Sequence, residues 1–264
     1  MTAITDASLT SDQLTPRSAV SIALLHAKFA FLESIRIPIA VIGNLLFPAL
    51  ALLFFVVPTV GDDATAATAA VGQLMVFAIM SANLFTYGTG VAEDRALPFD
   101  PFVRTLPASA APRLVGRVLN GLIFSASALV PVVLLGWLLT PASPSVGQFL
   151  GGLLFAIALA IPFTLLGLAI GYAMSAKAAI AVVQVVLFPM AFAGGLFLPP
   201  FLFPDWLNTI SLGLPSRAAR DIMVQITTGE TAPVSSWPVL IGWTALFAVL
   251  AIIAYRRDEG RRFK

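Results

Sequence analysis

Charged side chains that could do chemistry are scarce in this sequence and gather in a few short segments. Charged residues make up 11% of the chain, cysteine is absent, and His26 is the only histidine. Without thiolates and with a single imidazole, the sequence offers no metal-binding cluster and no catalytic dyad or triad. The chain by itself is therefore predicted to be neither an enzyme nor a metal protein. Its formal charge of +2 gives no support for a nucleic-acid partner.

A phosphate-binding loop is also missing from the sequence. No G-x-x-x-x-G-K-[ST] pattern is present, and none of the three lysines, Lys28, Lys177 and Lys264, follows a glycine-rich loop. Any ATP-driven activity is therefore expected to use an ATPase on another polypeptide, which would hold the ATP and Mg²⁺.

One charged segment lies between residues 91 and 121. Glu93, Asp94 and Arg95 are followed there by two aromatic residues, Phe99 and Phe102, among prolines and charges. Exposed aromatic side chains in such a loop are costly unless something covers them. A short helix could present them to a cytoplasmic partner, or they could tuck back under the helices or into the lipid headgroups, and the sequence leaves both readings open.

Another charged segment, from 205 to 221, lies in a region interrupted by Pro199, Pro200, Pro204 and Pro215. It contains five candidate residues of an outer cap, namely Asp205, Trp206, Arg217, Arg220 and Asp221. The 37 residues from 201 to 237 are too apolar for a free loop. Irregular backbone at membrane depth survives only when protein buries it or it lines water. The alternative is that Arg220 and Asp221 are simply exposed to solvent.

Long uncharged stretches must position these segments. No Asp, Glu, Lys or Arg occurs within residues 37–61, 64–92, 118–176, 178–204 or 231–255, and 59% of the chain is hydrophobic. About 20 apolar residues cross a hydrocarbon core about 30 Å thick. The third stretch is long enough to cross twice and contains a turn-rich break at 140–147. The sequence thus predicts an all-α membrane protein with six spans, at about 38–60, 69–91, 116–139, 149–173, 178–198 and 238–255.

The basic residues predict the orientation of these spans. With six spans, both termini lie on one side, and of the 15 basic residues only Arg217 and Arg220 lie on the other. Because basic loops stay cytoplasmic, both termini are expected in the cytoplasm. Residues 1–16 are predicted to be a disordered lead and residues 256–264 a basic tail.

Residues 17–36 have a helix-forming composition and moderate amphipathicity. They are predicted to form a helix in the cytoplasmic membrane interface, with their charges toward the headgroups. A simple cytoplasmic extension of the first span is the alternative.

Polar groups within the spans are few and uncharged. Asn44 and Gln184, on spans one and five, are candidates for lining a path, while Gln73 and Asn83 are typical of hydrogen bonds between helices. Gly167 and Gly171 fit a close-packing pattern. Ion-coupled carriers usually keep charged residues inside their spans, so a secondary carrier is the third and weakest reading.

The order of motifs resembles the membrane subunits of ABC-2 type ABC exporters. The acidic and arginine exit at 93–95, VRTLPAS at 103–109, RLVGRVLNG at 113–121 and the Gly-Gly, proline and short-helix region at 194–230 carry the resemblance. The Pro98-Phe99-Asp100-Pro101 turn departs from the Gly-containing acidic stretch of many relatives, which affects the expected shape of the coupling element.

The resemblance implies a role for each segment. Residues 17–36 would be a connecting helix, the loop 92–115 would hold a coupling helix at about 93–105 seated on an ATPase subunit, and the cap at 199–236 would hold re-entrant helices at 205–214 and 216–227. Two permease copies would pair, with spans one and five beside the path. The implied coupling residues are Glu93, Asp94, Arg95, Phe99, Asp100, Phe102 and Arg104.

Two functions of different classes remain open on these grounds. The favoured one is a permease subunit that exports a lipid or an amphipathic drug-like substrate across a bacterial plasma membrane, in contact with membrane lipids. The alternative is a six-helix membrane scaffold or assembly factor that transports nothing.

Overall fold

The computed structural model describes residues 46–97 and 110–261, together with six separate positions, Ser21, Leu24, Leu25, Lys28, Phe29 and Leu32. These six positions are helical. The predicted lead 1–16, most of the predicted interfacial helix 17–36 and residues 98–109 of the predicted coupling loop lie outside the described residues, so their assignments stay predictions.

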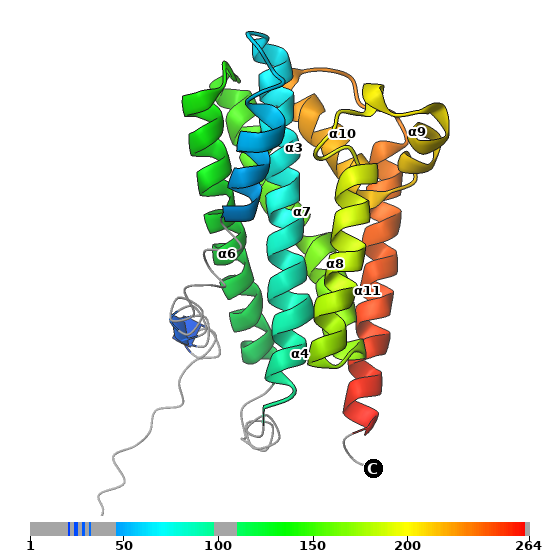
Figure 1. The fold of residues 1–264 in the computed structure, drawn as a ribbon. Coiled ribbons are helices and arrows are strands. Elements are labelled where there is room, and N and C mark those ends of the chain that lie inside the picture. Colours follow the sequence, from blue (N-terminus) through cyan, green and yellow to red (C-terminus); the bar gives the residue numbers. More distant parts are fainter. Residues whose placement is uncertain are drawn as a thin grey trace, which may run out of the picture.

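Within the described part of the chain, all regular structure is helical, as the sequence predicts (Figure 1). Five runs are long and apolar enough to cross a membrane, namely Ala64–Asp94, Gly121–Leu139, Val146–Ala173, Ala176–Ala193 and Ser236–Asp258. They correspond to predicted spans two to six. Span two comprises α3 (Ala64–Asn83), the π-helical η2 (Leu84–Thr89) and α4 (Gly90–Asp94), and spans three to six lie in α6 (Ala110–Leu139), α7 (Val146–Ala173), α8 (Ala176–Ala193) and α11 (Ser236–Arg261).

The first span is described over its last part. A shorter apolar helix, Leu46–Val56, ends in the π-helical η1 (Leu52–Val56). Residues 38–45 of the predicted span lie outside the described residues. The predicted all-α membrane fold is confirmed, with five complete apolar runs and this partly described helix.

Two boundaries differ from their predictions. Helix α8 ends at Ala193 rather than near 198. Gly195 follows with a φ of +76°, a left-handed conformation that favours glycine and ends the helix. Helix α6 begins at Ala110, so the connection after span two is shorter than the predicted 92–115. Pro112 lies in the first turn of α6, where its missing N–H removes no helical hydrogen bond.

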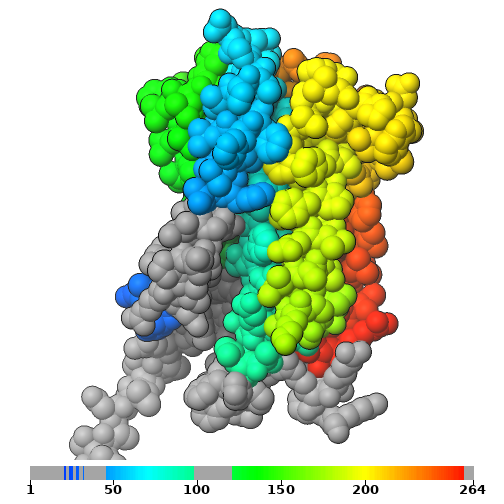
Figure 2. Space-filling model, in the orientation of Figure 1, coloured from blue at the N-terminus to red at the C-terminus, as the bar shows by residue number. Residues whose placement is uncertain are grey.

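The predicted outer cap contains three short helices, η3 (Pro200–Leu202), α9 (Asp205–Ser211) and α10 (Pro215–Thr228). Proline suits the first turn of α10, and Gly229, with a φ of +85°, ends that helix. Helix α10 packs against α3, α7 and α11. The space-filling view shows the cap projecting beyond the end of α8 (Figure 2).

The bundle has distinct inner and outer members. In the most apolar stretch of span two 83% of the residues are buried, whereas the corresponding share is only 22% in α8 and 17% in α11. Helix α3 therefore lies at the centre of the described helices. Helices α8 and α11 expose apolar side chains such as Val185 and Ile241. In a membrane these faces contact lipid or another membrane chain.

The connections alternate between two ends of the bundle (Figure 1). The cap end holds the turn before α3, the connection from α6 to α7 and helices α9 and α10. The loop end, as we call the other, holds the last turn of α4, the turn between α7 and α8, and the last turns of α11. This arrangement places Arg95, Lys177, Arg256 and Arg257 at the loop end and Arg217 and Arg220 at the cap end.

Spans two and four approach each other closely on the way to the loop end. A Cβ atom on Gly171 would lie 2.4 Å from the carbonyl oxygen of Tyr87, and one on Gly167 would lie 2.9 Å from that of Asn83. Both distances are too short for a side chain, so glycine permits this backbone contact. The close-packing role predicted for Gly167 and Gly171 is confirmed, and it brings the end of α7 beside α4.

Candidate functional site

The loop end carries the described part of the predicted coupling residues. Glu93 and Asp94 lie exposed in the last turn of α4, and Arg95 follows directly. The remaining coupling candidates, Phe99, Asp100, Phe102 and Arg104, lie outside the described residues. Their role in binding an ATPase therefore stays a prediction.

Arg95 turns back into the bundle and contacts two other spans. Its Nη1 donates to the carbonyl oxygens of Gly171 at 2.6 Å and Met174 at 3.1 Å. Its Nη2 donates to Oδ1 of Asp258, near the end of α11. The carbonyl groups at a helix C-terminus lack intrahelical partners and carry the negative end of the helix dipole, so a guanidinium is well placed there. We call Arg95, Asp258 and these two carbonyl groups the Arg95 clamp.

The Arg95 clamp is largely shielded from solvent. The side chain of Arg95 is 18% exposed and that of Asp258 only 3%. The guanidinium carbon lies 5.9 Å from the centre of the Tyr172 ring, and Tyr172 packs edge-to-face on Tyr255 at 5.1 Å. The clamp therefore joins the ends of spans two, four and six beside a small aromatic cluster.

Asp258 is a site residue that the sequence analysis placed only in the basic tail. A signal for it exists in the buried face of α11, which runs through Phe247, Ala251 and Ala254 and reaches Asp258 at the same spacing. Positions four, three and four residues apart share one face of a helix. Extending the apolar stripe of span six by one turn would have predicted that Asp258 points inward.

The cap end contains a second buried charge cluster, which we call the cap cluster, formed by Arg217, Arg220 and Asp221. Arg217 Nε donates to Asp221 Oδ2 at 2.8 Å, and Arg220 Nη1 donates to Asp221 Oδ1 at 2.9 Å. Asp221 is 4% exposed and Arg217 is 8% exposed, and the side chain of Arg220 is 14% exposed. The alternative in which Arg220 and Asp221 are simply solvent-exposed is therefore wrong. The amphipathic α10 turns its charged residues toward its neighbours in the cap.

Polar groups around the cap cluster complete its hydrogen bonds. Arg217 Nη1 donates to Asn208 Oδ1 at 3.1 Å and to Ser211 Oγ at 2.8 Å, both on α9. Gln73 of α3, with its amide oriented to match its neighbours, accepts from Arg220 Nη2 at 2.8 Å and donates to the Gly195 carbonyl at 3.1 Å. The cluster thus fastens α9 and α10 to each other and to span two.

Burial lowers the pKa of the Arg220 guanidinium, while the hydrogen bond and the charge of Asp221 oppose that shift. Because an arginine starts far above neutral pH, Arg220 remains charged in this part of the cap, outside the five spans. Arg220 accordingly contributes a positive charge to the cap cluster.

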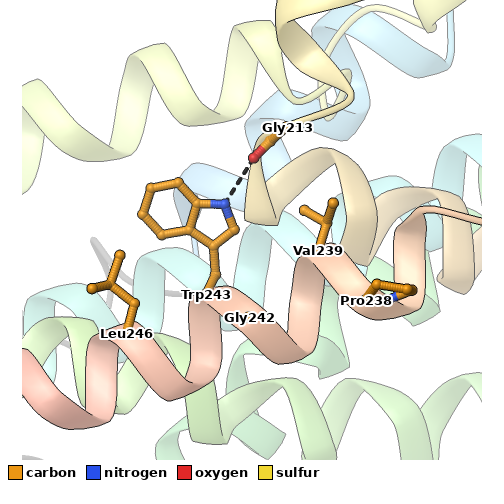
Figure 3. A pocket seen from close by; sticks show the side chains of 6 residues that line it. All are labelled: Gly213, Pro238, Val239, Gly242, Trp243 and Leu246. Atoms are coloured by element: carbon orange, nitrogen blue, oxygen red, sulfur yellow. Dashed lines mark hydrogen bonds between the residues drawn. The ribbon is translucent and has the colours of Figure 1, made fainter.

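The other cap candidates face outward. Asp205 and Trp206 begin α9, and Trp206 is 65% exposed, as suits an aromatic residue at a membrane interface. Beside α9 lies an open apolar groove of about 260 Å³, lined by Gly213, Pro238, Val239, Gly242, Trp243 and Leu246 (Figure 3). The indole Nε1 of Trp243 donates to the Gly213 carbonyl at 2.7 Å, which ties α11 to the cap.

The path-lining candidates are not brought together by the described residues. Gln184 lies on the exposed face of α8, next to Val185, which is 71% exposed. Asn44 lies outside the described residues. Both assignments stay predictions.

Asn83, a polar residue within span two, connects this span to two others. Its amide nitrogen donates to Ser125 Oγ of α6 at 2.8 Å, and its amide oxygen accepts from Thr164 Oγ1 of α7 at 2.8 Å. Asn83 therefore links spans two, three and four, as the sequence indicates for helix–helix hydrogen bonding.

Most of the chain is similar to a known protein family. Residues 24–227 match the model of the family described as ABC-2 type transporter. The chain belongs to the ABC-2 type transporter family. It is therefore a multi-pass membrane protein and a transport component, as the motif order predicts.

A relative of this ABC-2 type transporter is the Bacillus subtilis (strain 168) protein named "Putative transport permease YvfS". The two are 23% identical over 187 residues, which cover 71% of this chain and 76% of the relative. The family match begins before the first span and ends within α10, so α11 and Asp258 lie beyond the matched residues.

Proposed function

We propose that the chain is the permease subunit of an ATP-binding cassette exporter, which moves a lipid or an amphipathic drug-like substrate out of the cell. Membership of the ABC-2 type transporter family is the observation that carries this proposal. The name of the Bacillus subtilis relative, a transport permease, agrees with it.

The loop end faces the cytoplasm in this proposal, in a bacterial plasma membrane. Arg95, Lys177, Arg256 and Arg257 gather at that end, and cytoplasmic connections are the ones enriched in basic residues. Both termini and the coupling loop then lie inside the cell, while the cap cluster lies toward the outside.

Energy would come from a cytoplasmic ATPase subunit that binds ATP and Mg²⁺ and docks on the segment after Arg95. The printed 264 residues contain no phosphate-binding loop, which supports a separate site for ATP. ATP-driven closure of that subunit would favour one arrangement of the spans over another.

Two permease copies would pair through the exposed apolar faces of spans one and five. Helix α8 exposes Val185 and Ile180 along with Gln184, and the apolar helix Leu46–Val56 exposes Phe54 at 71%. A path between two such apolar faces suits a substrate with a large apolar part. This is the support for a lipid or amphipathic substrate and for Gln184 as a lining residue.

Purification of the tagged chain from its native membrane tests this function. We expect an ATP-binding cassette subunit to copurify, and its ATP hydrolysis in liposomes to respond to lipids or amphipathic drugs. The variant Asp100→Arg should weaken this complex, because it reverses a charge in the predicted coupling loop. Asp62→Arg, an equal reversal on an exposed residue at the cap end, is the matched control.

Three results would contradict the proposal at different levels. Absence of any ATPase in the purified complex would remove the energy source. Equal effects of Asp100→Arg and Asp62→Arg would contradict docking of the ATPase on the predicted coupling loop. An ATPase that copurifies but drives no substrate movement would favour the scaffold reading.

A further inference from the structure

The Arg95 clamp connects helices that the coupling loop does not itself join. The loop lies between spans two and three, so docking of an ATPase would act first on those two spans. Arg95, at the start of the loop, instead contacts the ends of α7 and α11. Asp258 is 163 positions away along the chain. The clamp is therefore a tertiary contact between the ends of separate spans.

We propose that the Arg95 clamp transmits movement of the coupling loop to spans four and six, so that the end of α11 belongs to the coupling apparatus. This inference rests on the proposed function, since it needs an ATPase that moves the loop. It assigns Arg95 and Asp258 as positioning residues. Asp258 lies outside the residues matched by the family model.

The geometry of the guanidinium suits this role. Arg95 is a planar fork with fixed donor directions, and one of its arms reaches two carbonyl groups of α7 while the other reaches α11. Hydrogen bonds weaken steeply when their distances and angles change. Small displacements of the end of α4 are therefore passed on to α7 and α11 rather than absorbed.

The burial of Asp258 strengthens the connection to span six. Its side chain is 3% exposed, so its ion pair with Arg95 is shielded from water. In an ion pair at the surface, water could replace either partner at little cost, so such a pair would transmit little force. The neighbouring contact of Tyr172 and Tyr255 is an aromatic edge-to-face packing without such directional charge.

Spin-label distances in the permease–ATPase complex test the clamp. The chain contains no cysteine, so pairs of introduced cysteines can be labelled without background. One pair, Ile253→Cys with Ile180→Cys, reports the inner part of α11 relative to α8, and a second, Ile123→Cys with Ile180→Cys, reports α6. All three side chains are exposed. Labelled subunits are diluted with unlabelled ones and measured in liposomes, without nucleotide and with ATP trapped on a hydrolysis-deficient ATPase subunit.

We expect trapped ATP to shift both distance distributions in the parent. Arg95→Gln should abolish most of the α11 shift and retain the α6 shift, because only the clamp is lost. The double variant Arg95→Asp with Asp258→Arg should restore part of the α11 shift. Arg257→Gln, which removes an exposed charge beside Asp258, should leave both shifts unchanged. If Arg95→Gln does not accumulate in the membrane, Arg95→Lys, which keeps the charge and lacks the fork, should reduce the α11 shift alone.

The outcomes separate this inference from the function on which it rests. A full α11 shift in Arg95→Gln or Arg95→Lys would overturn the clamp. So would a parent in which α6 moves and α11 does not, although the proposed function would stand. A parent in which neither helix responds to ATP would overturn both.

Discussion

The two buried charge clusters of this transporter differ in how far along the chain their partners lie. In the cap cluster, Arg217 and Arg220 pair with Asp221, four and one positions away on the same helix. In the Arg95 clamp, the partners of Arg95 lie 76, 79 and 163 positions away, on two other spans. One cluster is assembled within a short helix, and the other exists only when three spans are packed together.

The two ends of the bundle therefore differ in what their charge clusters hold together. The cap cluster fixes the shape of α9 and α10 and fastens them to span two through Gln73. The clamp instead makes the ends of separate helices depend on one another. Loss of the first should therefore have local consequences, and loss of the second should spread through the loop end.

The largest effect on stability is expected for Arg217→Gln. The substitution removes the donors to Asp221, Asn208 and Ser211 in a site where Arg217 is 8% exposed. Breaking a buried ion pair costs about 3–5 kcal/mol, and we expect the lower end because Arg220 still binds Asp221. Thermal unfolding in detergent measures the loss, and hydrogen exchange should rise mainly in α9 and α10. Arg256→Gln, at an exposed position, is the control; equal losses in the two variants would contradict the buried network.

Asp258→Asn is expected to lower the free energy of unfolding less than Arg217→Gln does. Its effect should nevertheless reach more helices. It removes the charge that Arg95 binds, and a hydrogen bond to a charged group contributes about 1.5–3 kcal/mol. Hydrogen exchange should rise at the ends of α4, α7 and α11 together. A rise confined to α11 would show that the three ends are independent, and the contrast with the cap cluster would disappear.

Asn83→Ala tests the uncharged connection between the two ends. It removes the hydrogen bonds to Ser125 and Thr164. A polar contact between spans contributes about 0.6 kcal/mol on average and about 1.7 kcal/mol at most. Thermal unfolding should register about 1 kcal/mol. Ser127→Ala, whose hydroxyl donates to the Ile123 carbonyl of its own helix, should have almost no effect. Equal effects would argue against a link between spans.

The smallest effect is expected for Trp243→Phe. The ring remains apolar, and the exposed hydrogen bond to the Gly213 carbonyl is lost, which costs about 0.5 kcal/mol. Hydrogen exchange around Gly213 should rise slightly, while the rest of the cap stays protected by the cap cluster. The comparable variant Trp206→Phe, at an exposed indole, should change neither exchange nor unfolding.

Periodicity and charge distribution predict most of the fold, because a membrane span must be long, apolar and helical. They place the five described spans within a few residues of the observed bounds, whereas the two cap helices, α9 and α10, were implied by the resemblance to ABC-2 type exporters. The end of α8 was predicted too far along because Leu196, Phe197 and Leu198 are apolar, although the left-handed Gly195 has already ended the helix.

The charge clusters were harder to predict than the spans. Arg217, Arg220 and Asp221 were identified as a group because they are neighbours in sequence, but only tertiary packing decides that they are buried. The pairing of Arg95 with Asp258 depends on the relative rotation and end positions of three helices. The sequence contains the inward-facing stripe of α11 but does not indicate which basic residue meets its last member.

The role of the clamp in coupling requires that the loop end faces the cytoplasm, and single-cysteine accessibility measures this orientation directly. Val234→Cys lies in an exposed loop at the cap end, and Arg257→Cys lies at the exposed face of the loop end. In intact cells a membrane-impermeant maleimide should label Val234→Cys at once and Arg257→Cys only after the membrane is opened. Immediate labelling of Arg257→Cys with protection of Val234→Cys would place the clamp outside the cell and contradict its role in coupling.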